Sequence, residues 1–565
     1  MKKHILHPKL SFENMRDVIE FAGNEFAGKT AYSFRQSPLD RDVIKISFHQ
    51  FRNEVRALAS ELLYMGCAGK HCAVIGRLSY DWAVIYFAML SIGAVIVPLD
   101  KEWNSADLAD TAAKAKAEFL FIDEDIAEKA TEIQSAAALL APAVYMNARK
   151  NKNNIRTLIA YGNLKFQTNP AAYFNATINT EQLSLLVFTS GTTGKGKGVM
   201  LSQNAIISDI TAALPYIDYT DKTVGVLPPH HTYGSTVMFA AHAIIGAEIY
   251  VSSGLRYVSA ELKEQKPGHM VLVPLYLETF YRKILATLKK QGKEALVNRM
   301  IKLSNGARKI GINGSNLLFK TLRDAFGGRL KTVICGGAPL NPDIIAFFDS
   351  IGIKVLNGYG ITECAPLIAF NRSKNIVDNS VGNVIDIDTV KISKPNEYGE
   401  GEILVKGPNV MLGYYNDADA TAEAIDKMGY FHTGDYGRLD KNKVLYITGR
   451  KKNLIILSNG KNVYPEEIEN DLIATPGILE IVVYEGKSRS GMENNCIVAE
   501  IFPDKDYCNK NGVTDIKAHL KPFIDEYNKN AVAYKRIKLI KIRNEEFPKN
   551  TLRKIMRFKI DMTID

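Results

Sequence analysis

Short apolar runs rich in β-branched residues alternate with longer helical stretches from about Ser47 to Leu445. Cys72–Ile75, Ala94–Val97 and Phe119–Ile122 have the length and composition of buried strands, and segments with helical periodicity connect them. Buried strands joined by helices are typical of parallel sheets, because a parallel pair needs a long crossover connection. We therefore expect an α/β fold, with a large N-terminal domain of parallel-rich sheets packed with helices.

The pattern changes after Asp440. Strands and helices continue beyond this point, but they are too few for another large sheet. The basic segment Arg450–Asn453 predicts a linker, and the residues after it predict a small, mobile α+β domain. We expect an N-terminal domain over residues 1–450, a C-terminal domain over residues 451–565 and a hinge at residues 450–453.

An uncharged stretch of eighteen residues, Trp82–Leu99, is close to the minimum length of a membrane-spanning helix. Because Gly93 and Pro98 interrupt it, we expect a helix from Asp81 to about Ile92 and then a short buried strand. The N-terminus lacks the apolar core of a signal peptide, and the six cysteines are scattered without metal-ligand spacing. These features predict a reducing compartment and a cytoplasmic protein.

Positive charge is concentrated in two segments. The chain has 71 Lys and Arg against 61 Asp and Glu, a net charge of 71 − 61 = +10. Tyr281–Lys309 and Lys535–Lys559 each carry a net charge of +8, so the rest of the chain is mildly acidic. Each segment is either a solvated helix face or a contact for an anionic partner.

The segment Leu185–Ser202 reads LLVFTSGTTGKGKGVMLS, a β run that ends in a loop dense in Gly, Thr, Ser and Lys. Backbone N–H groups, hydroxyls and an ammonium group can surround phosphate oxygens, so a nucleotide is expected. A Walker A loop fits poorly, because Gly198 stands where that motif needs Ser or Thr and no helix-forming run follows. A surface loop without a ligand is the alternative for this stretch taken alone.

The loop TSGTTGKGKGVML resembles the phosphate-binding signature of the adenylate-forming (AMP-binding) superfamily. That superfamily includes acyl-CoA synthetases, luciferases and peptide-synthetase adenylation domains. Further motifs resemble the superfamily in its order, namely LPPHHTYG, GGAP, NGYGITECAP, GEILVKGPNVMLGYYN, YFHTGDYGRLD, YITGRKKNLIILSNGKNVYPEEIE and PKNTLRKIMR. Because they span nearly the whole chain, it is identified as a member.

The resemblance implies formation of an acyl adenylate from ATP with Mg²⁺. Lys554 would bridge the substrate carboxylate and the α-phosphate, Thr362 would donate to the α-phosphate, and Glu363 would hold the metal. Leu552 and Arg553 stand where the family often has Ser-Gly, which predicts a stiffer loop before the lysine. A solvated tail lysine and a helix N-cap are the local alternatives for Lys554 and for the Thr-Glu pair.

The resemblance also implies a nucleotide site. Asp435 would accept both ribose hydroxyls, Arg450 would contact the ribose from the other side, and Tyr359 would stack on adenine. The full ATP/AMP-binding set by resemblance is Thr189, Ser190, Gly191, Thr192, Thr193, Gly194, Lys195, Gly337, Ala338, Pro339, Asn357, Gly358, Tyr359, Gly360, Asp435, Ile447 and Arg450. Structural turns are a compatible alternative for the glycines.

Three other functions follow from the resemblance. His231 would gate the acyl pocket, although the adjacent His230 competes for this assignment and a satisfied buried histidine is the alternative. Lys452 occupies the hinge position, where a few backbone rotations would exchange the adenylation face for a thiol channel. Ser458 and Gly460 would line that coenzyme A channel.

The segment Lys283–Arg329 resembles the helical segment of bacterial long-chain fatty acid–CoA ligases. It implies a medium- to long-chain fatty acid as substrate and coenzyme A as acceptor. The alternative is a fatty acyl-AMP ligase that loads the phosphopantetheine thiol of an acyl carrier protein. The same basic, amphipathic segment suggests peripheral contact with the inner face of a membrane. No nucleic-acid partner is expected.

Overall fold

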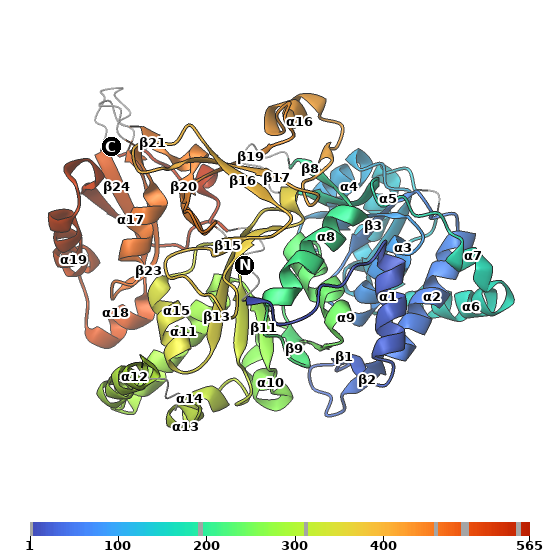
Figure 1. The fold of residues 1–565 in the computed structure, drawn as a ribbon, viewed down its shortest axis with the longest axis horizontal. Helices are drawn as coiled ribbons and strands as arrows, with labels where there is room; N and C mark the ends of the chain where they lie inside the picture. The colour runs from blue at the N-terminus through green and yellow to red at the C-terminus, as the bar shows by residue number, and fades with distance from the viewer. Residues whose placement is uncertain are drawn as a thin grey trace.

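The computed structural model describes residues 4–139, 141–189, 196–309, 315–456, 462–486, 496–549 and 555–564. Figure 1 shows a large body of sheets and helices that contains the N-terminus, and a smaller group of elements around β23, β24 and α17–α19 at one side. The expected α/β fold class is confirmed.

A seven-stranded sheet forms the core of the N-terminal half, in the order β18-β8-β7-β4-β3-β5-β6. The strands β7, β4, β3, β5 and β6 are parallel, whereas β8 and β18 run antiparallel to their neighbours. Their bounds are β3 His71–Ile75, β4 Val95–Leu99, β5 Phe119–Asp123, β6 Val144–Met146, β7 Leu183–Phe188, β8 Gly198–Ser202 and β18 Gly413–Tyr414. The accompanying helices are α1 Met15–Glu25, α2 Phe48–Tyr64, α3 Tyr80–Leu90, α4 Ser105–Lys114, η2 Glu124–Lys129, α5 Ala130–Ala136, α6 Ile155–Thr168, α7 Pro170–Phe174, α8 Gln203–Ala213 and η3 Leu214–Tyr216.

The uncharged stretch Trp82–Leu99 forms a buried helix and a buried strand, as predicted. All eleven residues of α3 are buried, and the Ser79 hydroxyl oxygen caps the helix by accepting from the Trp82 N–H. Gly93 has a φ of +71°, and a Cβ there would lie 2.8 Å from the Thr177 carbonyl. The turn between α3 and β4 therefore requires glycine. No helix in the described ranges is long and apolar enough to cross a membrane.

Two further mixed sheets complete the parallel part of the fold. One has the order β2-β1-β10-β9, with bounds β1 Thr30–Phe34, β2 Ile44–Ser47, β9 Lys222–Gly225 and β10 Glu248–Val251. The other has the order β11-β12-β13-β14-β15, with bounds β11 His269–Leu272, β12 Thr332–Cys335, β13 Lys354–Gly360, β14 Leu367–Phe370 and β15 Asn383–Val384. The helices between these strands are η4 Tyr233–Ala241, α9 His242–Ile245, α10 Val258–Gln265, α11 Pro274–Lys290, α12 Glu294–Lys309, α13 Ser315–Leu318, α14 Lys320–Asp324, α15 Pro342–Ser350 and η5 Thr362–Cys364.

The segment from Thr389 to Arg450 differs from the predicted alternation of strands and helices. It forms an antiparallel sheet in the order β16-β17-β19-β20, with bounds β16 Thr389–Ser393, β17 Gly401–Lys406, β19 Phe431–Leu439 and β20 Leu445–Arg450. A short helix, α16 Ala418–Ala424, lies between β17 and β19 in the chain. Because short turns join β16 to β17 and β19 to β20, these strands pair as hairpins rather than through crossovers.

The C-terminal residues form their own α+β unit. A three-stranded sheet in the order β23-β24-β25 packs with α17 and α19 through buried residues such as Ile468, Val483, Ile501 and Ile524. The bounds are η6 Lys451–Asn453, β21 Ile455–Ile456, β22 Asn462–Val463, α17 Pro465–Leu472, β23 Ile478–Gly486, β24 Cys496–Pro503, α18 Lys505–Asn511, α19 Ile516–Asn530, η7 Ala533–Lys535, β25 Ile537–Ile542 and η8 Arg557–Lys559.

Candidate functional site

The glycine-rich loop connects two antiparallel strands. The Thr189 N–H donates to the Lys197 carbonyl (3.0 Å), which closes the base of the loop between β7 and β8. A Cβ on Gly196 would lie 2.5 Å from the Thr189 carbonyl, so this base requires glycine. A strand, β8, follows the loop, whereas a Walker A loop opens a helix. The predicted phosphate-binding residues Ser190, Gly191, Thr192, Thr193, Gly194 and Lys195 lie outside the described residues.

Glu363 lies near the loop end of this hairpin. Its Oε1 accepts a hydrogen bond from the Tyr414 hydroxyl (3.0 Å), and Tyr414 pairs with Val199 across β18 and β8. The Lys197 Nζ sits 4.6 Å from the centre of the Tyr414 ring. Tyr414 therefore contacts both Lys197 at the base of the loop and Glu363 in η5.

The structure does not place Thr362 or Glu363 at a helix N-cap, which was the local alternative for this pair. Both residues lie within the three-residue helix η5, and Ile361 occupies its N-cap position. Burial raises the pKa of Glu363, and the hydrogen bond from Tyr414 opposes this rise. A buried carboxylate with a raised pKa is stabilised in its charged form by a nearby cation.

Glu363 fits the expected metal ligand. The part of the chain that the structure describes contains no group of three His, Cys, Asp or Glu that could hold a metal ion. Mg²⁺ commonly binds through one or two carboxylates together with substrate phosphates, so a lone acid near the base of the glycine-rich loop has the right chemistry.

Asp435 on β19 accepts donors from two other strands. The Tyr359 hydroxyl at the end of β13 donates to Asp435 Oδ2 (2.7 Å), and Arg450 Nε pairs with Oδ1 (3.1 Å) from β20. The Asp435 side chain is 5% exposed and that of Arg450 is 57% exposed. The carboxylate is thus held in place, while the arginine can move into solvent or toward a ligand.

Two of the predicted ATP/AMP-binding segments, Gly337–Pro339 and Asn357–Gly360, pack against each other and would form the walls of an adenine slot. Gly337–Pro339 follows β12, and Asn357–Gly360 ends β13, the neighbouring parallel strand. A Cβ on Gly336 would lie 3.3 Å from the Gly358 carbonyl, and Gly337 has a φ of +91°. The Tyr233 hydroxyl lies 3.1 Å from the Ile334 carbonyl, so the LPPHHTYG segment borders the same region. Ile447 lies on β20, opposite Gly437 of β19.

His230 and His231 differ in environment. The two rings are 4.2 Å apart, but His230 is buried and its Nε2 lies 3.4 Å from Asp100 Oδ2. Burial lowers the pKa of His230. His231 is half-buried, and its carbonyl accepts from the Ser235 N–H in η4. His230 is therefore the more buried of the two, although its Nε2 has no hydrogen-bond partner among the described residues, and the gating role of His231 stays a prediction.

The predicted catalytic lysine, Lys554, lies outside the described residues, but the residues that flank its segment are defined. Lys549 and Ile555 pair as an antiparallel bridge, and the Met556 N–H donates to the Pro548 carbonyl (2.7 Å). Glu278 of α11 has a pKa raised mainly by burial, and the charge of Lys549 opposes that rise. The Lys549 ammonium itself pairs with Glu480 of β23 and with Glu546 (2.8 Å), which anchors this part of the chain to the C-terminal sheet.

The predicted hinge lies where the two parts of the chain meet. Lys452 is exposed in η6, and its neighbour Lys451 pairs with Glu402 of β17 (2.9 Å). A Cβ on Gly449 would lie 2.9 Å from the Tyr464 ring, so the C-terminal part packs closely on β20. Ser458 and Gly460, the predicted channel residues, lie outside the described residues.

Sequence reasoning did not assign Tyr414, Lys197 or Tyr233 to the site. All three lie inside the quoted motifs. The motifs therefore indicated which segments form the site, but not which of their side chains contact it. The structure brings together Tyr359, Glu363, Asp435, Arg450 and the two glycine-containing walls.

Comparison with known sequences identifies both parts of the chain. The profile of the AMP-binding enzyme family matches residues 19–415, and that of the AMP-binding enzyme C-terminal domain matches residues 452–562. The long-chain-fatty-acid–CoA ligase FadD15 of Mycobacterium bovis is 27% identical over 472 residues, which cover 80% of this chain and 77% of that protein. The human long-chain-fatty-acid–CoA ligase 6 is 26% identical over 510 residues, which cover 84% and 72%.

Solved structures share the fold. The ATP-bound MatB from Rhodopseudomonas palustris superposes with a TM-score of 0.74 at 22% identity, covering 96% of this chain and 97% of that chain. The anthranilate CoA ligase AuaEII in complex with anthranoyl-AMP superposes with a TM-score of 0.76 at 18% identity, covering 98% and 97%.

Proposed function

Because the chain belongs to the AMP-binding enzyme family, we propose that it activates a medium- to long-chain fatty acid with ATP and transfers the acyl group to coenzyme A. The first step forms acyl-AMP and releases pyrophosphate, and the second forms acyl-CoA and releases AMP. The observation that carries the proposal is the match over most of the chain to bacterial and mammalian relatives named long-chain-fatty-acid–CoA ligases. These names favour coenzyme A over an acyl carrier protein as the acceptor.

The glycine-rich loop and η5 would hold the triphosphate. Thr189 and residues 190–195 would surround the phosphates, with Lys197 behind them over Tyr414. Thr362 would donate to the α-phosphate, and Glu363 would hold Mg²⁺ with its carboxylate oriented by Tyr414. Bound Mg²⁺ would supply positive charge against the phosphate oxygens.

Asp435, Tyr359 and Arg450 would bind the nucleoside. A carboxylate has about four lone-pair sites, so Asp435 can accept ribose hydroxyls beside the hydrogen bond from Tyr359. The exposed Arg450 can turn from Oδ1 toward the ribose. Gly337–Pro339 and Asn357–Gly360, with Ile447 nearby, would form the adenine slot.

Lys554 would stabilise the charge that develops when the fatty acid carboxylate attacks the α-phosphate. Lys549, which lies before the segment that contains Lys554, pairs with Glu480 of β23 and with Glu546. We propose that residues 1–450 and 451–565 are the two domains and that rotation about Lys452 would bring Ser458 and Gly460 to the thiol arm of coenzyme A. His231 would gate the acyl pocket.

We also propose that α12 rests on an anionic membrane surface in the cytoplasm. Leu296 and Leu303 are 56% and 72% exposed, one heptad apart, and the cations Arg299 and Lys302 between them are exposed as well. In vesicle sedimentation, Leu296→Ser with Leu303→Ser should weaken binding. Binding that does not depend on anionic lipid would contradict this contact.

The function is tested by measuring AMP and pyrophosphate with ATP, Mg²⁺ and a panel of carboxylic acids from acetate to stearate, each with and without coenzyme A. AMP release that requires both a long acid and coenzyme A is the expected result. An acyl adenylate that accumulates despite coenzyme A would contradict the proposed acceptor, and formation of ADP would contradict adenylation.

A further inference from the structure

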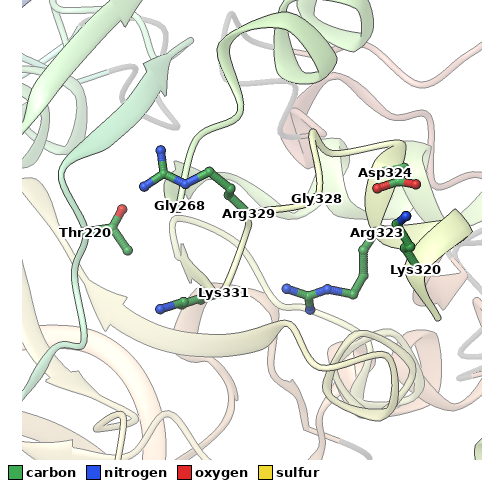
Figure 2. Close-up of a pocket in the computed structure, with 8 residues that line it drawn as sticks. All are labelled: Thr220, Gly268, Lys320, Arg323, Asp324, Gly328, Arg329 and Lys331. Atoms are coloured by element: carbon green, nitrogen blue, oxygen red, sulfur yellow. The ribbon is translucent and has the colours of Figure 1, made fainter. Parts of the chain in front are cut away.

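A pocket of about 390 Å³ opens on the large body near α14 (Figure 2). Gly268 and Lys331, which line it, immediately precede β11 and β12, so the pocket lies at the amino ends of these strands. The predicted adenine-slot segment Gly337–Pro339 follows Gly336, the first residue after the carboxyl end of β12. Four strand residues separate the two, a span of about 13 Å. The pocket is therefore distinct from the nucleotide site.

Positive charge dominates the lining. Lys320, Arg323, Arg329 and Lys331 contribute four cations, and Asp324 contributes the lining carboxylate. Arg329 pairs at the surface with Asp221 (2.9 Å), and both side chains are more than half exposed. Lys320 and Lys331 are exposed and form no ion pair with a carboxylate in the ranges that the structure describes. Figure 2 shows Arg329 and Lys331 extending to the same side, toward Thr220.

Arg323 places a buried charge in the wall. It is 6% exposed, and its guanidinium donates to the carbonyls of Gly352 (2.7 Å) and Leu330 (3.0 Å). Burial lowers its pKa, and no described carboxylate forms an ion pair with it. Neutral carbonyls satisfy its N–H groups but do not cancel its charge, and a buried charge without a counterion is costly. An anion in the pocket would compensate this charge.

We infer that this pocket binds a phosphate group. The flexible ammonium groups of Lys320 and Lys331 can approach a compact dianion from different directions. Arg323 adds a fixed positive charge in the wall of the pocket. The pocket volume is at the lower end of the range for small-molecule sites, which suits a phosphate ester. The phosphate group comes either from a soluble compound or from a lipid headgroup, and Leu318 of α13, 44% exposed, lies close in sequence to Lys320.

The first arm of the test measures binding of inorganic phosphate by calorimetry at fixed ionic strength. The pocket variant is Lys320→Gln with Lys331→Gln, and the matched control is Lys427→Gln with Lys517→Gln, two exposed lysines elsewhere in the chain. Both variants lose two surface charges, and neither loses a described ion pair, so both should fold. We expect affinity about tenfold weaker in the pocket variant and unchanged in the control.

The second arm measures sedimentation with phosphatidylcholine vesicles that do or do not contain phosphatidic acid. Selective loss of phosphatidic acid binding in the pocket variant would support the site and identify a lipid headgroup as its source. Selective loss of inorganic phosphate binding alone would support the site and identify a soluble source. If the pocket variant matches the control in both arms, the pocket is not a phosphate site.

Discussion

Tyr359 donates a hydrogen bond of 2.7 Å to Asp435, a residue 76 positions later in the chain. Burial and the negative charge of Asp435 raise the pKa of the Tyr359 hydroxyl, so it stays a donor at every physiological pH. The carboxylate that we propose for ribose binding is therefore oriented before the nucleotide arrives. Orientation of this kind reduces the entropy cost of binding.

Replacing Tyr359 with Phe should weaken ATP binding. The change removes the donor to Asp435 Oδ2 but keeps the ring, so we expect KM for ATP to rise about tenfold with a smaller change in kcat. Steady-state kinetics with varied ATP measure this split. Tyr398→Phe, at a tyrosine that is 69% exposed, is the matched control and should leave KM unchanged. An equal loss in kcat with no change in KM would contradict a binding role.

Replacing Tyr414 with Phe should shift the pH dependence of the reaction. The hydrogen bond from Tyr414 lowers the pKa of Glu363 against the larger effect of burial, so its loss lets that pKa rise. The charged form of Glu363 would hold the metal. As the pH is lowered, the variant should therefore lose activity at a higher pH than the wild type does. The measurement is kcat/KM as a function of pH at saturating Mg²⁺. An acid limb at the wild-type position would count against this role for Glu363.

Replacing Lys554 with Ala should abolish adenylate formation while ATP binding stays largely intact. The lysine would act on charge that develops in the transition state, so a loss of about two to three orders of magnitude in rate is expected. Acid-dependent exchange of pyrophosphate into ATP measures adenylation, and calorimetry measures ATP binding. Lys559→Ala, at an exposed lysine nearby, is the control. Adenylation at near the wild-type rate would show that the catalytic assignment is wrong.

Acid should destabilise the fold through the buried pair His242 and His269. Their Nε2 atoms are 3.0 Å apart, and His242 Nδ1 donates to the Val237 carbonyl, so His269 must donate between the rings. Thr220 then donates to His269 Nδ1 (2.9 Å), and both rings are neutral. Burial lowers the pKa of His242 to about 4 and lowers that of His269 as well.

The sign of this effect follows from proton binding. Between the unfolded pKa of about 6.5 and a folded value of about 4, the unfolded chain binds more protons, so stability falls as pH falls. His242 alone would contribute a loss of about 2 to 3 kcal/mol between neutral pH and pH of about 4.5. Denaturant unfolding over this range measures it. His242→Gln should flatten the slope, and an unchanged slope would contradict the prediction.

The local pattern of the sequence predicted the elements that depend on neighbouring residues. Gly93 and Pro98 interrupt an apolar stretch, and the chain accordingly forms α3, a turn and β4 there. The sequence has no helix-forming run directly after the glycine-rich loop, and β8 follows there. The predicted alternation did not extend to β16–β20, because hairpin pairing depends on which strands meet and not on strand composition alone.

The sequence by itself determined the class of fold, the order of the motifs and the family, because each is written in contiguous residues. The tertiary structure alone decided which side chains meet: Tyr414 reaches Glu363 because β18 pairs with β8, and Lys289 of α11 reaches Asn511 of α18 because the C-terminal part packs on α11. It also gathered Lys320 and Lys331 around the buried Arg323. Contacts of this kind join residues from separate elements, and they exist only once the sheets and helices have packed against one another.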